Sequence, residues 1–209
     1  MEASPAGTAT QAPAEFIQRV TPWVVTITSM VAFAAAAVLM VEKIILLGDP
    51  TYVPTCSINP VLSCGSIMKS DQAEAFGFPN PLLGLAGFGL MTTFGAATLV
   101  GVRAPRFAWL LAQAGAVFAF GFVCWLIFQS LYRIEALCPY CMVVWLATFT
   151  LAWYLTLANF SSGRLRVPER LRPLLGFATK YHAVLLTGAV LIVVALITEA
   201  FWSYWSTLP

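Results

Sequence analysis

Charged side chains are scarce in this sequence. Only 10% of its 209 residues are Asp, Glu, Lys or Arg, and 60% are hydrophobic, whereas a soluble domain averages about 25% charged and about 45–50% apolar residues. This composition excludes an ordinary soluble domain. The sequence also contains no internal repeat, no glycine-rich phosphate-binding loop and no dinucleotide-binding fingerprint. The net charge of +2 does not support a nucleic-acid partner, and we expect none.

Five apolar runs are long enough to cross a bilayer, for which a helix needs about 20 residues. We expect transmembrane helices near residues 22–41, 81–102, 107–131, 139–158 and 181–202. The first run exceeds the roughly 7 to 15 residues of a signal-peptide core, so we interpret it as an uncleaved anchor. The sequence therefore predicts an all-α integral membrane protein.

The basic residues predict an orientation, because Lys and Arg accumulate in the cytoplasmic loops of membrane proteins. A cytoplasmic N-terminus places most of them inside, namely Arg19, Arg103, Arg106, Arg164, Arg166, Arg170, Arg172 and Lys180. Only Lys43, Lys69 and Arg133 then lie outside. In this orientation the long loop 48–80 and the start of the fourth helix share the extracytoplasmic side, where disulfides persist.

Two cysteines open the fourth apolar run, in the sequence Cys138-Pro139-Tyr140-Cys141. Proline suits the first position of a helix, where its missing N–H would have no partner in any case. Cys138 is then expected at the N-cap, and helix N-termini lower the pKa of a thiol and favour the reactive thiolate. Cys141 falls on the same helix face, one turn deeper in the apolar zone.

A second pair, Cys56 and Cys64, lies in the polar loop, where Pro60 prevents a helix between them. A purely structural disulfide explains this loop as well as redox chemistry does, and a zinc site built from all four sulfurs is a further alternative. Electrons pass between two dithiol pairs by thiolate attack on a disulfide. One loop pair and one fixed pair at a helix mouth therefore favour a thiol–disulfide relay. Cys124, inside the third run, is interpreted as a packing residue.

The order of these motifs resembles the vitamin K epoxide reductase family of membrane thiol oxidoreductases. The resemblance rests on Cys56 and Cys64 with seven residues between them, on Ser70, on Asn80-Pro81-Leu82-Leu83-Gly84, and on Cys138-Pro139-Tyr140-Cys141. It implies a four-helix bundle around a quinone, and the fifth helix resembles that of bacterial members. No metal is implied.

The resemblance also implies a role for each paired cysteine. Cys56 would be the thiol that faces a protein partner, and Cys64 would exchange with Cys138. Cys141 would be the thiol that reacts with quinone. If the cysteines only staple the outer surface, Cys56 would instead stay paired with Cys64.

Three other residues are expected near the quinone. The resemblance gives Asn80 the role of hydrogen-bond donor to a quinone oxygen and places Ser70 near the active site. Trp145, one turn below Cys141, is a candidate contact on the quinone side. The vertebrate branch has Thr-Tyr-Ala where Val144-Trp145-Leu146 stands here, and Pro81 follows Asn80 where a serine is usual.

The function implied is a thiol:quinone oxidoreductase that reoxidises a separate thioredoxin-fold (DsbA-like) protein outside the cytoplasm. The cofactor would be a membrane quinone, menaquinone or ubiquinone, with a naphthoquinone favoured. The location would be a bacterial inner membrane. A non-enzymatic transporter or assembly protein with structural disulfides and a quinone epoxide reductase are the alternatives.

Four segments follow from this interpretation. Residues 1–18 are expected to be a disordered cytoplasmic tail, and residues 19–160 the four-helix catalytic unit. Residues 161–180 form a basic cytoplasmic connector that fixes topology and meets anionic lipid. Residues 181–209 hold the fifth helix and a short extracytoplasmic tail.

Overall fold

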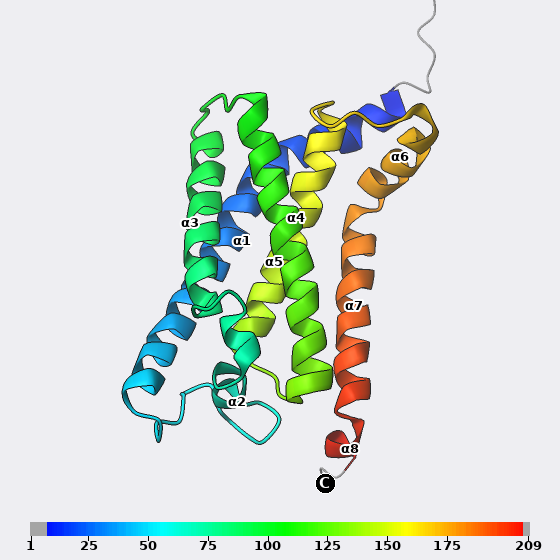
Figure 1. Cartoon of the computed structure of the whole chain (residues 1–209). Coiled ribbons are helices and arrows are strands. Elements are labelled where there is room, and N and C mark those ends of the chain that lie inside the picture. The colour runs from blue at the N-terminus through cyan, green and yellow to red at the C-terminus, as the bar shows by residue number, and fades with distance from the viewer. Residues whose placement is uncertain (1–7, 207–209) are drawn as a thin grey trace, which may run out of the picture.

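The computed structural model describes residues 8–206, with side chains from residue 13 onward. Over this part of the chain the protein is helical, and the only β-pairing is one isolated bridge. Five helices are apolar and long enough to span a membrane, as expected from the sequence. They are α1 (Thr8–Gly48), α3 (Asn80–Leu99), α4 (Arg106–Gln129), α5 (Pro139–Ser161) and α7 (His182–Ala200) (Figure 1).

The first helix starts earlier than expected. It already includes residues 8–18, so the expectation of disorder is wrong there, whereas residues 1–7 lie outside the described part. Ile17 is fully buried in a cluster with Leu157 and Ala158 at the end of α5. Burying an isoleucine stabilises a protein by about 1.5–3 kcal/mol, and this contact explains why the helix extends beyond the predicted span.

Helices α1, α3, α4 and α5 form the bundle expected from the resemblance. In Figure 1, α1 runs diagonally across the bundle, and it packs against both α3 and α5. The approach of α3 to α1 requires a glycine at one point. A Cβ atom on Gly95 would lie only 2.9 Å from the backbone nitrogen of Thr26. No larger residue fits there without moving a helix.

The fifth membrane-length helix, α7, stands at the side of the bundle (Figure 1). None of its residues is buried, and Leu191 and Ile192 are 60% and 63% exposed. In a membrane, lipid chains would cover these side chains. Near its C-terminal end, Val193 and Leu196 pack against a core cluster that contains Trp145. The fold is therefore a four-helix unit with one peripheral helix.

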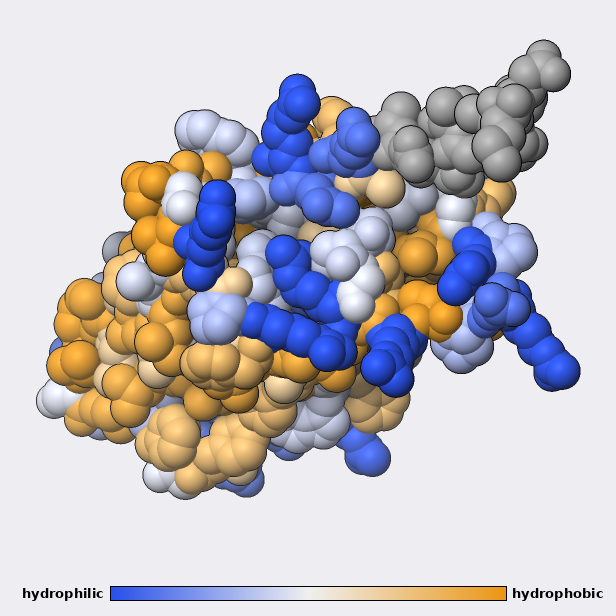
Figure 2. Space-filling model, turned by 90° about the horizontal axis from the view of Figure 1, so that it is seen from above, coloured by the Kyte–Doolittle hydropathy of each residue, from blue (hydrophilic) through white to orange (hydrophobic). Residues whose placement is uncertain are grey.

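The two ends of the bundle differ in composition. The cysteine end carries the loop after α1, with α2 (Cys64–Met68) and η1 (Asp71–Glu74), the π-helical turn η2 (Ser130–Ile134) and α8 (Trp202–Trp205). The arginine end carries the α3–α4 loop and the connector after α5, with η3 (Glu169–Leu171) and α6 (Arg172–Lys180). Figure 2 looks onto the arginine end, where hydrophilic side chains gather over the ends of the apolar helices.

Candidate active site

A short parallel β-bridge brings the two cysteine segments together. The backbone N–H of Leu137 donates to the carbonyl of Val61 over 2.7 Å, and the N–H of Ser63 donates to the carbonyl of Leu137 over 2.9 Å. Each of these segments leads directly into a cysteine, Cys64 on one side and Cys138 on the other. The backbone therefore places two cysteines that are 74 residues apart side by side.

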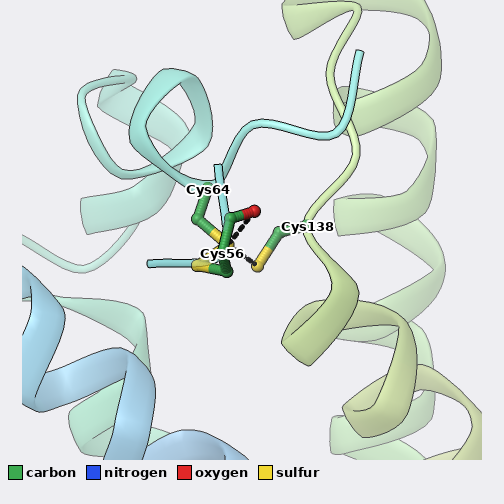
Figure 3. A group of neighbouring side chains, drawn as sticks. All are labelled: Cys56, Cys64 and Cys138. Carbon is green, nitrogen blue, oxygen red and sulfur yellow. Dashed lines mark hydrogen bonds between the residues drawn. A yellow bond between two sulfur atoms is a disulfide. The ribbon is translucent and has the colours of Figure 1, made fainter. Parts of the chain in front are cut away.

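Three sulfur atoms meet at this point (Figure 3). Cys56 and Cys64 form a disulfide, and the Sγ atom of Cys64 lies 2.8 Å from the Sγ atom of Cys138. All three Sγ atoms lie within 4.8 Å of one another. Cys56, Cys64 and Cys138 are 5%, 0% and 1% exposed. The sulfur of Cys64 is thus bonded to one cysteine and in contact with the next, inside a covered site.

Cys138 is the N-cap of α5, followed by Pro139 in the first turn, as the sequence predicts. The pKa of the Cys138 thiol is lowered, mainly because the Cys141 thiol can donate a hydrogen bond to the thiolate. The N–H groups of Tyr140 and Cys141 also favour the thiolate, and together these groups outweigh the effect of burial. The N–H groups of the helix terminus thus lower the pKa of Cys138, but the hydrogen bond from the Cys141 thiol lowers it more.

A cavity of about 640 Å³ opens between α1, α3, α4 and α5. Its walls are mainly apolar, and Cys64, Cys138 and Cys141 line it together with Ser70, Asn80 and Trp145. The structure therefore brings six of the seven predicted site residues to one cavity, and the seventh, Cys56, is bonded to Cys64. Binding sites for small molecules typically measure about 300–1,000 Å³, so this cavity can hold one.

Asn80 and Ser70 hold the segment that covers the mouth of the cavity. The side-chain amide of Asn80 donates to the carbonyl of Gln72 over 2.7 Å, and its oxygen accepts from the N–H of Ala75 over 3.2 Å. The hydroxyl of Ser70 donates to the carbonyl of Ile67 over 2.7 Å. Asn80 has two amide hydrogens, so its bond to Gln72 leaves one for a ligand.

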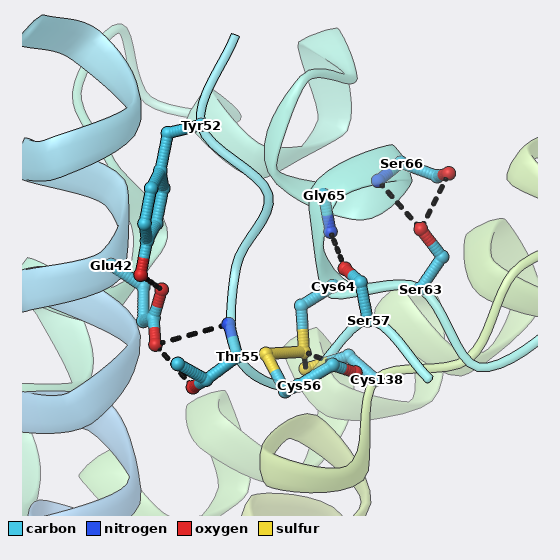
Figure 4. Close-up of a disulfide and its surroundings, with 10 residues drawn as sticks. All are labelled: Glu42, Tyr52, Thr55, Cys56, Ser57, Ser63, Cys64, Gly65, Ser66 and Cys138. Atoms are coloured by element: carbon cyan, nitrogen blue, oxygen red, sulfur yellow. Dashed lines mark hydrogen bonds between the residues drawn. A yellow bond between two sulfur atoms is a disulfide. The ribbon is translucent and has the colours of Figure 1, made fainter. Parts of the chain in front are cut away.

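Glu42, near the C-terminal end of α1, fixes the segment before Cys56 (Figure 4). Its carboxylate accepts hydrogen bonds from the Tyr52 hydroxyl, over 2.9 Å, and from the Thr55 hydroxyl and backbone N–H. The same bond raises the pKa of Tyr52, because a phenolate could not donate to the carboxylate. Glu42 is 6% exposed, so it is a buried anchor for this segment.

Its neighbour Lys43 fixes the segment after Cys64. The Lys43 ammonium donates to the carbonyl of Met68 over 2.7 Å and lies 2.9 Å from a carboxylate oxygen of Glu74. Lys43 also lines the cavity. No site role was predicted for Glu42 or Lys43, although adjacent charged residues at the end of an apolar run are a signal of function in membrane proteins.

Two serines hold the first turn of α2. The Ser63 hydroxyl accepts from the N–H of Ser66 as an N-cap, over 3.2 Å, and the Ser57 hydroxyl accepts from the N–H of Gly65 over 3.2 Å. Both bonds appear in Figure 4, on the same side of the disulfide. Cys64, the first residue of α2, is thereby fixed at its position beside Cys138.

The three clustered sulfurs are also close enough to hold a metal ion. Zinc binds cysteine as the thiolate, however, and Cys56 and Cys64 are joined as a disulfide. In this redox state Cys138 is the one member of the cluster with a free thiol. The arrangement therefore fits thiol–disulfide exchange better than metal binding.

Comparison with known proteins agrees with this geometry. Residues 23–156 match the family model described as the vitamin K epoxide reductase family. The match covers all three clustered cysteines, Cys141 and most of each of the four helices that line the cavity. No curated protein sequence matches the chain significantly.

Proposed function

Since the chain belongs to the vitamin K epoxide reductase family, we propose that it oxidises a thiol protein outside the cytoplasm and reduces a membrane quinone. Membership identifies it as a multi-pass membrane oxidoreductase of thiols and disulfides in a family that uses quinones. The observation that carries the finer proposal is the position of Cys64. Its sulfur is bonded to Cys56 and lies 2.8 Å from the sulfur of Cys138.

The relay would run in three exchanges, each of which breaks one S–S bond and forms another. A partner dithiol reduces the Cys56–Cys64 disulfide, and the partner becomes oxidised. The Cys64 thiolate then attacks Cys138 of a Cys138–Cys141 disulfide, and Cys141 leaves as a thiolate. Cys56 next attacks Cys64, which restores the first disulfide and releases Cys138. The structure, with Cys56–Cys64 oxidised and the other pair as thiols, corresponds to the state after this transfer.

The residues around the cavity fit a quinone. A bound quinone would supply an acceptor for two electrons and two protons. The apolar walls suit its ring and isoprenoid chain, and Cys141 lines the cavity one turn inside the membrane-spanning helix. We assign Asn80, through its second amide hydrogen, and Trp145 to its oxygens, with Ser70 holding the segment above. Menaquinone or ubiquinone would fit, and a naphthoquinone is favoured.

The surface around Cys56 supports a protein partner. Val53 and Ile58 are 69% and 70% exposed on either side of it. Exposed apolar side chains beside a disulfide suit a separate thioredoxin-fold (DsbA-like) protein. Because Cys56 itself is only 5% exposed, the partner would have to displace part of the loop before attack.

The distribution of charge supports the orientation that we propose. The arginine end would face the cytoplasm and the cysteine end the outside of a bacterial inner membrane. The cysteines would then lie in an oxidising compartment. The segment boundaries at residues 161 and 181 stay part of the proposal, whereas α1 continues through residue 19 without a break.

The decisive experiment is a quinone-reduction assay with a reduced thioredoxin-fold protein as electron donor. We expect Cys141→Ser to abolish turnover, because a serine hydroxyl at neutral pH is no comparable nucleophile. The same variant should still form mixed disulfides with the donor. Cys124→Ser serves as the control, since Cys124 lies on α4 outside the sulfur cluster, and it should turn over normally.

Two results would favour other functions. If the wild type reduces no quinone with any thiol donor while Cys56 and Cys64 stay paired throughout, the cysteines only staple the outer surface. If the wild type reduces a quinone epoxide faster than it reduces a quinone, the protein is a quinone epoxide reductase. Wild-type turnover by Cys141→Ser would remove Cys141 from its assigned role.

A further inference from the structure

A second cavity lies at the arginine end, away from the cysteines. It has a volume of about 280 Å³ and is lined by the N-terminal half of α1, the end of α3, the α3–α4 loop, the start of α4, the end of α5 and the connector. Its polar lining residues include Gln18, Thr98, Arg103 and Arg164. The first cavity is mainly apolar, whereas this one is lined by two arginines, so the two cavities suit different ligands.

Arg164 is held in place before any ligand binds. Its guanidinium stacks over the Trp109 ring at 4.1 Å, and its Nη1 donates to the Ser162 hydroxyl over 2.7 Å. Its backbone carbonyl accepts two hydrogen bonds from Arg106, from Nε over 3.1 Å and from Nη2 over 2.7 Å. The side chain therefore loses little freedom when it binds an anion, which favours affinity.

Within the described part of the chain, no carboxylate pairs with the arginines of this cavity. Among residues 13–206 the two ion pairs are Lys43–Glu74 and Arg172–Glu169, so Arg103 and Arg164 have no carboxylate partner. Arg164 is partly buried, and this burial lowers the pKa of its guanidinium group. A desolvated cation without a counter-ion is costly, and an anion from outside the chain would relieve that cost.

We propose that this cavity binds the phosphate group of an anionic phospholipid. Guanidinium groups bind phosphate through paired, charge-assisted hydrogen bonds, and basic pockets between membrane helices are suited to anionic headgroups. The cavity lies at the ends of membrane-length helices, where headgroups are found. Val100 and Val102, next to Arg103, are 82% and 56% exposed, so acyl chains would cover them while the phosphate reaches the arginines.

Binding can be measured by native mass spectrometry of the purified protein titrated with phosphatidylglycerol, with zwitterionic phosphatidylcholine as the reference lipid. We expect Arg103→Gln and Arg164→Gln each to weaken the binding of phosphatidylglycerol about fivefold, since a basic side chain near an anionic lipid contributes about 1 kcal/mol. The matched control is Arg166→Gln, which removes the same charge two residues away, outside the cavity. It should bind like the wild type.

Arg164→Gln also removes packing on Trp109 and could destabilise the protein for that reason. If Arg164→Gln is unstable, Arg103→Gln, at an exposed residue, tests the proposal alone. Equal losses in Arg103→Gln and Arg166→Gln would overturn the proposal, because the lipid would then respond only to overall charge. Inorganic phosphate at millimolar concentration should not displace the lipid. If it does, and stabilises the protein as well as the lipid does, the cavity is a site for a soluble anion. The readout involves no thiol chemistry, so it is independent of the redox proposal.

Discussion

Cys56→Ala should trap a disulfide between Cys64 and Cys138. The two Sγ atoms are 2.8 Å apart, and a disulfide bond measures about 2.03–2.05 Å. A side-chain movement of under about 1 Å therefore suffices to form the bond, and the backbone bridge already holds the two segments together. Without Cys56, the cluster contains no third sulfur that can attack Cys64 and release Cys138.

Trypsin makes this linkage easy to detect. Cleavage after Lys43 and Lys69 leaves Cys56 and Cys64 on one peptide, residues 44–69, and cleavage after Arg133 and Arg164 leaves Cys138 on residues 134–164. The wild-type disulfide is internal to the first peptide. A trapped disulfide joins the two peptides, and mass spectrometry without reductant would show the joined mass. Cys56→Ala combined with Cys141→Ala removes the competing partner of Cys138.

The trapped bond should also change stability. It closes a separation of 74 residues, against 8 for the Cys56–Cys64 bond. In the chain-entropy model these loops are worth about 4.4 and about 2.5 kcal/mol, a difference of about 2 kcal/mol. Unfolding in sodium dodecyl sulfate should therefore require more detergent for the trapped variant, and a reductant should abolish the difference. Free Cys64 and Cys138 thiols in this variant under oxidising conditions would refute the reasoning.

Two further predictions concern acidity and the cover of the cavity. The midpoint of Cys138 alkylation against pH should lie below about 8.5. It should be higher in Cys141→Ala than in Cys141→Ser, because serine keeps a hydrogen-bond donor for the Cys138 thiolate. Equal midpoints in the two variants would show that the Cys141 hydrogen bond is not the main cause of the lowered pKa. Lys43→Met should speed hydrogen exchange over residues 68–75 and destabilise the fold by about 1–3 kcal/mol, since a charged hydrogen bond and the pair with Glu74 are lost. The control Lys69→Met, at an exposed residue, should change stability by less than about 0.5 kcal/mol. Equal exchange rates in the two variants would count against the role of Lys43 as an anchor of this segment.

Local composition was sufficient to find the membrane helices, because a run of about 20 apolar residues is typical of a membrane-spanning helix. It did not find the start of α1. Residues 8–18 are polar enough to resemble a tail, but Ile17 packs against Leu157 and Ala158, which stabilises this part of the helix. Such contacts join residues distant in sequence, so the pattern of the first helix alone contains no trace of them.

The site shows the same division. The N-cap position of Cys138 follows from the proline after it, which is a local rule. The pairing of the Val61–Ser63 segment with Leu137 is not local, and the sequence suggested it only through the family resemblance. Glu42 and Lys43 were visible in the sequence as charges beside an apolar run, yet their partners lie up to 31 residues further along the chain, at Glu74. Their role as anchors could only be found in three dimensions.

The backbone bridge at Leu137 has a kinetic consequence. It does not depend on any disulfide, so Cys138 stays next to Cys64 in every redox state in which the two hydrogen bonds persist. The encounter of these two sulfurs is intramolecular and has a high effective concentration, which dilution of the protein in the membrane leaves unchanged. The encounter with the thiol partner is bimolecular. At low partner concentration the turnover rate per enzyme molecule should therefore rise in proportion to the concentration of the partner. It should not change when the enzyme is diluted with additional lipid.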